Sequence, residues 1–82
     1  MIERPMTTHE FYFRLFSYRL DVLFAQQRYR LEVQVLERLK VAYDGQVPQA
    51  IWEKQRRRVK RTQIQLAVRR SMLTVFLEDL RN

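Results

Sequence analysis

Cysteine is absent from this 82-residue chain, and glycine and proline are scarce, with one and two residues respectively. Without cysteine no disulfide bond can form, and the absence is typical of proteins from a reducing compartment. Hydrophobic residues make up 46% of the chain. A chain this apolar, and with so few residues that favour turns, is not a disordered tail. At this length it forms one domain with a small core.

Residues that carry catalysis or bind metal ions are also scarce. The only histidine, His9, lies in the first turn of a predicted helix, and the carboxylates are scattered along the chain. A catalytic or metal site needs several such groups that converge. A single glycine cannot form a glycine-rich phosphate loop. We therefore expect a non-enzymatic protein with no catalytic residue, no metal ion and no cofactor.

Long apolar runs are missing as well. No run approaches the ~18–20 residues that a membrane-spanning helix requires. Residues 1–5 lack the basic and then apolar layout of a signal peptide. Together with the absence of cysteine, these features predict an intracellular, cytoplasmic protein without a transmembrane segment.

Two long segments without glycine or proline are separated by one short break. Thr7 and Glu10 have the spacing of a capping box, which marks the start of a helix. Gly45 suits the left-handed C′ position that ends a helix, and Pro48 suits the first turn of the next one. The sequence predicts an all-α single domain over residues 1–82, with one helix at about 8–43, a turn at 44–47 and a second helix at about 48–80. Because the connection is short, the two helices should form an antiparallel hairpin.

Apolar residues recur at spacings that predict a seam between these helices. On the second helix Trp52, Val59, Leu66, Leu73 and Leu80 recur every seven residues. On the first helix we expect a similar seam, which comprises Leu20, Phe24, Leu31, Val35, Leu39 and Ala42. Seams of this kind are typical of antiparallel coiled-coil packing.

Further apolar residues remain outside the seam. A second stripe follows the second helix, and residues 11–25 are apolar on nearly all sides of the first. A lone hairpin has one internal interface, so these side chains would face water. We expect them to form an oligomer interface in a homodimeric four-helix bundle, although a different partner chain would cover them equally well. The predicted interface residues are Phe13, Phe16, Ile64, Val68, Met72 and Val75.

Positive charge is concentrated in one part of the chain. The formal net charge is +7, and thirteen of the sixteen basic residues are arginine. Segment 54–77 holds eight basic residues and no acidic residue, a net charge of +8, whereas the other residues hold eight basic against nine acidic residues, a net of −1. Like charges repel one another, so a purely structural face normally intersperses acids. This asymmetry indicates an anionic partner.

The basic residues of the second helix have helical spacing. Lys54, Arg57, Arg58 and Arg61 lie at i, i+3, i+4 and i+7, which places them on one stripe. Antiparallel pairing should bring two arginines of the first helix to the same level. The predicted nucleic-acid-binding residues are Lys54, Arg56, Arg57, Arg58, Lys60 and Arg61, supported by Arg28 and Arg30.

This pattern favours binding to the phosphate backbone of nucleic acid without base-sequence readout. Gln55, Gln63 and Gln65 could reach sugar hydroxyls or phosphates, which would favour double-stranded RNA if the shape of the duplex is what is read. The alternative is a small helical interaction module (a chaperone, inhibitor or assembly subunit) that docks a partner through its apolar end. In that case the basic residues would steer an acidic protein partner, and an anionic membrane surface is a third possible partner.

Overall fold

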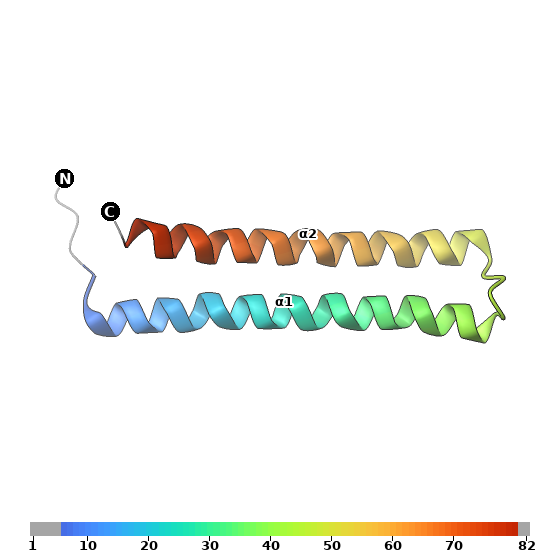
Figure 1. The fold of residues 1–82 in the computed structure, drawn as a ribbon, viewed down its shortest axis with the longest axis horizontal. Coiled ribbons are helices and arrows are strands. Elements are labelled where there is room, and N and C mark those ends of the chain that lie inside the picture. The colour runs from blue at the N-terminus through green and yellow to red at the C-terminus, as the bar shows by residue number, and fades with distance from the viewer. Residues whose placement is uncertain (1–5, 81–82) are drawn as a thin grey trace.

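The computed structural model describes residues 6–80, which form two helices packed side by side. Helix α1 spans Thr8–Ala42 and helix α2 spans Gln49–Asp79. The hairpin measures 60 × 21 × 17 Å, with the start of α1 and the end of α2 at one end and the turn at the other (Figure 1). The predicted all-α antiparallel hairpin is confirmed. The four-helix bundle requires a second chain and stays a prediction. Residues 1–5, on which the signal-peptide expectation rests, and residues 81–82 lie outside the described residues.

Thr7 caps the start of α1. Its hydroxyl oxygen accepts a hydrogen bond from the backbone N–H of Glu10 at 3.1 Å. This bond satisfies one of the four N–H groups that a helix start leaves without a partner. Glu10 in the first turn and Lys40 in the last turn also have the charges that a helix dipole favours.

The turn ends α1 with two consecutive left-handed residues. The N–H of Gly45 donates to the carbonyl of Lys40 at 2.7 Å, and the N–H of Asp44 donates to the carbonyl of Val41 at 3.2 Å. These two bonds make a Schellman motif, in which Asp44 (φ 52°) occupies the C′ position and Gly45 (φ 82°) follows it. The expectation that Gly45 is the C′ residue was therefore wrong by one position. Aspartate can take this place because it enters the left-handed region more readily than most residues with a side chain.

The two helices contact each other along one seam whose residues alternate three and four apart. This is the spacing of coiled-coil packing. On α1 the seam comprises Phe11, Leu15, Tyr18, Val22, Ala25, Tyr29, Glu32, Leu36 and Leu39. On α2 it comprises Trp52, Gln55, Val59, Thr62, Leu66, Leu73 and Phe76, and Arg69, at the position between the two leucines, is exposed. Among residues 6–80 only Leu66, Phe76 and Gln55 are buried, with exposed fractions of 7%, 9% and 5%.

Part of the predicted seam lies elsewhere. On α2 Leu66 is buried and Trp52, Val59 and Leu73 are half-buried, whereas Leu80 is exposed. On α1 Leu20 and Leu39 are half-buried, but the other four predicted residues, Phe24, Leu31, Val35 and Ala42, are exposed.

The prediction failed for these four residues because the side of α1 that contacts α2 is less hydrophobic than the predicted side. The contacting side carries Tyr18, Ala25, Tyr29 and Glu32. At the end of the seam away from the turn, three aromatic rings pack together. The centroid of the Phe76 ring lies 4.9 Å from that of Tyr18 and 5.9 Å from that of Phe11.

Replacing Leu66 by alanine should lower the free energy of unfolding by about 2–4 kcal/mol, because truncating a packed leucine leaves a cavity. Gln65→Ala, one residue before it on α2 at an exposed polar position, should change it by less than about 0.5 kcal/mol. Urea unfolding followed by circular dichroism measures both. Equal effects of the two substitutions would contradict the observed seam.

Replacing Gly45 by alanine should lower the free energy of unfolding by about 1 kcal/mol, because φ of 82° disfavours any residue with a Cβ atom. No atom lies within 4 Å of the position that this Cβ would take, so the loss is purely conformational. Asp44→Gly is the matched variant, and it should be neutral or stabilising in the same urea unfolding experiment. A destabilisation by Asp44→Gly as large as that by Gly45→Ala would contradict this turn geometry.

Candidate interaction surfaces

Six basic side chains cluster on the half of α2 that lies near the turn. All six are exposed: Lys54, Arg56, Arg57, Arg58, Lys60 and Arg61. Within residues 6–80, no carboxylate forms an ion pair with any of them. Further along α2, by contrast, Arg69 lies 4.0 Å from the carboxylate of Asp21. The charge of the six is therefore not compensated inside the described part of the hairpin.

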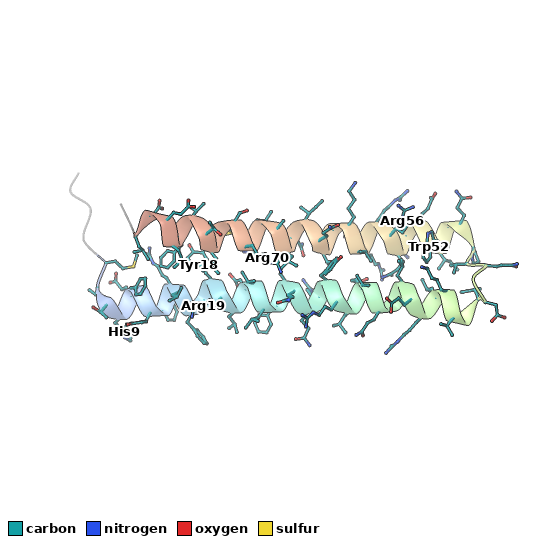
Figure 2. All side chains as sticks on the ribbon, viewed as in Figure 1. His9, Tyr18, Arg19, Trp52, Arg56 and Arg70 are labelled. Carbon is teal, nitrogen blue, oxygen red and sulfur yellow. The ribbon has the colours of Figure 1, made fainter. Side chains whose placement is uncertain are left out.

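These six side chains are distributed over two sides of α2. Arg56, Arg57 and Lys60 line a shallow groove beside α1, and Figure 2 shows Arg56 on this half of α2. The other residues of this groove are Leu36, Glu53, Val59 and Gln63. Lys54, Arg58 and Arg61 do not line it. The basic surface thus wraps around α2 and is wider than a single stripe.

The two arginines predicted to support this surface lie apart. Arg30 lines a groove together with Gln63 and Arg70, whereas Arg28 does not. They are two positions apart, which is a rotation of about 200° around the helix axis. Arg70 was not among the predicted residues. The sequence feature that could have identified Arg70 is its spacing. Gln63, Ala67 and Arg70 recur every three or four positions, so they lie on the same side of α2, and the hairpin register places that side beside Arg30.

A polar pair crosses the seam between Gln55, which is buried, and Glu32, which is half-buried. The side-chain amide of Gln55 donates to the backbone carbonyl of Glu32 at 2.9 Å and to its carboxylate at 2.7 Å. The expectation that Gln55 reaches a sugar hydroxyl was wrong, because its amide lies inside the hairpin. Gln63 and Gln65 are exposed. A polar pair in an apolar seam fixes the register, since any shift would separate the two groups.

Trp52 lies between the helices near the turn (Figure 2). It is half-buried, and the ammonium group of Lys40 lies 5.4 Å from the centroid of its ring. This is the geometry of a cation–π contact. Packing on the seam, as the seven-residue spacing predicts, accounts for this residue.

A first exposed apolar surface, the α2 stripe, consists of Ile64, Val68, Met72 and Val75. These side chains are 40–56% exposed. They line a shallow groove to which α1 contributes Arg14 and Tyr18. All four were predicted to form an oligomer interface, and the structure places them together on the half of α2 away from the turn.

A second exposed apolar surface, the α1 stripe, follows the outer side of α1. Phe13 and Phe16 are 66% and 63% exposed. The stripe continues along Leu20, Leu23, Phe24 and Leu31, which line a groove made of α1 residues alone. Phe13 and Phe16 do not line the groove of the α2 stripe. The six predicted interface residues therefore belong to two separate surfaces.

The remaining candidate groups for catalysis or metal binding lie as follows within residues 6–80. His9 is exposed at the start of α1 (Figure 2). No group of three or more histidine, aspartate or glutamate side chains there is arranged to hold a metal ion. Neither described helix combines the length and the apolar character needed to cross a lipid bilayer.

Comparison with known protein families, with curated protein sequences and with solved structures finds no match to this chain. Its function is therefore inferred from its own residues.

Replacing Gln55 by alanine should lower the free energy of unfolding by about 1–3 kcal/mol, because the carboxylate of Glu32 would lose its donor inside the seam. Gln65→Ala is the matched control: it removes an exposed glutamine from the same helix and should have an effect below about 0.5 kcal/mol. Replacing both Glu32 and Gln55 by leucine should recover most of the loss. Urea unfolding of the four proteins tests this, and equal values for the two glutamine variants would contradict the polar pair.

Proposed function

We propose that this chain is a non-enzymatic helical assembly module, which docks helices of protein partners on its outer apolar surfaces. The observation that carries the proposal is where the large apolar side chains lie. Among residues 6–80, two hydrophobic side chains are buried and sixteen large hydrophobic ones are exposed. Monomeric soluble proteins rarely leave so much apolar surface in contact with water.

The energetics of burial support this role. Covering one large apolar side chain contributes roughly 1.5–3 kcal/mol, which is a substantial part of the stability of a small domain. A core this small rarely stabilises a chain of this length without a partner, a metal or a disulfide. The chain has no cysteine. Association is the remaining way to stabilise the hairpin.

The basic surface adds specificity to such docking. It adjoins the α2 stripe, so α2 is cationic on its half near the turn and apolar on the other. A partner helix that follows α2 along its length would need acidic residues on one half and apolar residues on the other. Complementary charge of this kind directs orientation and excludes wrong partners.

Site-specific photo-crosslinking in living cells tests the assembly role. A photoreactive phenylalanine analogue at Phe16 or Met72 should give adducts of discrete mass, because these exposed side chains would contact a partner. Glu37 on α1 and Thr74 on α2 are matched control positions, exposed on the same helices but outside both stripes. Adducts equally strong at the control positions, or none at Phe16 and Met72, would contradict the proposal.

A second function has its own support in the six uncompensated basic side chains. In this role they would bind the phosphate backbone of nucleic acid without reading base sequence, with double-stranded RNA as one candidate. Arginine suits this task because its planar group makes paired hydrogen bonds to phosphate oxygens. From Lys54 to Arg61 these groups follow about 10 Å of a straight helix.

Fluorescence anisotropy with short RNA and DNA duplexes at several salt concentrations tests this second function. The logarithm of affinity should fall linearly with the logarithm of salt concentration, with a slope near −0.9 for each DNA phosphate neutralised. Lys54→Glu with Arg57→Glu should abolish binding. Arg14→Glu with Arg19→Glu, which changes net charge equally on the other helix, should weaken it much less. No binding by the unmodified protein at about 0.15 M salt would exclude this function.

A further inference from the structure

The α2 stripe has a charged residue of opposite sign at each end. Arg61 precedes the four apolar side chains Ile64, Val68, Met72 and Val75, and Glu78 and Asp79 follow them, all at spacings of three or four residues. These two acids are the only ones after Glu53. Arg61, Glu78 and Asp79 are exposed, and none forms an ion pair within residues 6–80. About 26 Å of helix separate Arg61 from Glu78, so they cannot pair within one chain.

We infer that a second copy of this chain covers the α2 stripe, with the two α2 helices antiparallel across a two-fold axis. The inference rests on the assembly role proposed above and names the partner of one of the two apolar surfaces. It predicts an isologous interface, in which each contact occurs twice.

When two copies of the stripe run in opposite directions, apolar residues lie opposite apolar residues and each basic end lies opposite an acidic end. An axis that passes between Val68 and Met72 places Val68 opposite Met72 of the second copy and Ile64 opposite Val75. The same alignment places Arg61 opposite Glu78 and Asp79. Apolar side chains thus meet in the middle, and an ion pair closes each end. Rim pairs of this type contribute little energy but fix orientation.

Charge also excludes the parallel alternative. Two parallel α2 helices in register would place Arg61 beside Arg61 and Glu78 beside Glu78, and like charges in such positions repel. In the antiparallel pair the two turn-proximal halves extend away from the axis in opposite directions. Lys54, Arg57 and Arg58 therefore stay accessible to an anionic partner, and the α1 stripe stays available to another protein.

Sedimentation equilibrium of the purified chain between about 1 and 100 µM, the range of ordinary protein association, tests the inference. The unmodified chain should dimerise. Val68→Asp with Met72→Asp should weaken the dimer at least tenfold, because charges would be buried in its centre. Gln27→Asp with Gln34→Asp, at exposed polar positions of α1, is the matched control and should leave the dimer intact. Circular dichroism reports whether each variant is still helical.

A charge exchange tests the antiparallel register. Arg61→Glu should weaken the dimer roughly tenfold, since it would place like charges opposite each other at both ends. Adding Glu78→Arg and Asp79→Arg to this variant should restore most of the affinity, because the pairs would form with reversed signs. Failure of the restoration, with helicity retained, would overturn the antiparallel register.

The remaining outcomes separate this inference from the proposed function. A partly helical monomer at 100 µM whose Met72 position still crosslinks to a different protein in cells would overturn the second copy and leave the assembly role standing. A dimer that tolerates Val68→Asp with Met72→Asp would also overturn the inference. A monomer without crosslinks at Phe16 and Met72 would overturn both.

Discussion

Two helices that contact each other along one seam can each bury only one side, and this constraint governs the whole molecule. The seam here is narrow and partly polar, with Glu32, Gln55 and Thr62 among its residues. Its apolar packing centres on Leu66 and on the ring cluster around Phe76. Among residues 6–80, sixteen large hydrophobic side chains remain exposed. We propose that binding to other chains covers these exposed side chains and stabilises the hairpin.

The register of the seam decides which groups lie at each end of the molecule. The hydrogen bonds between Gln55 and Glu32 hold it in the turn-proximal half, and the contacts of Phe76 with Phe11 and Tyr18 hold it at the other end. Charge and hydrophobicity are consequently separated along a rod whose longest dimension is 60 Å. The turn-proximal half of α2 presents basic side chains, and the two apolar stripes lie on the other half of α2 and along α1.

The hairpin itself could be predicted from sequence because it depends on local signals. An uninterrupted run of helix-forming residues, the cap at Thr7 and the break around Gly45 are sufficient to define two antiparallel helices. The exact position of the left-handed turn residue could not be predicted, because aspartate and glycine both tolerate that conformation. The basic segment was also visible, since charge counts do not depend on the fold.

The contacting side of α1 could not be predicted from hydrophobicity. The most apolar stripe, with Phe24 and Leu31, faces outward, and a stripe with Tyr18, Tyr29 and Glu32 faces α2. Periodicity identifies apolar stripes but does not say which of two stripes meets the neighbouring helix and which meets another chain. Two further features depend on the register of the two helices and could not be predicted for the same reason. They are the groove that Arg30 and Arg70 line together and the burial of Gln55.

Thermal unfolding of the purified chain at two concentrations tests most directly whether the hairpin depends on association. Unfolding would be followed by circular dichroism at about 1 µM and about 100 µM, because a protein stabilised by binding its own copies has a concentration-dependent Tm. We predict that Tm rises by at least about 5 °C over this range, or that the chain is only partly helical at both concentrations when its partner is a different protein. A fully helical chain that unfolds cooperatively at the same Tm at both concentrations would contradict the account, because it would show that the narrow seam alone is sufficient.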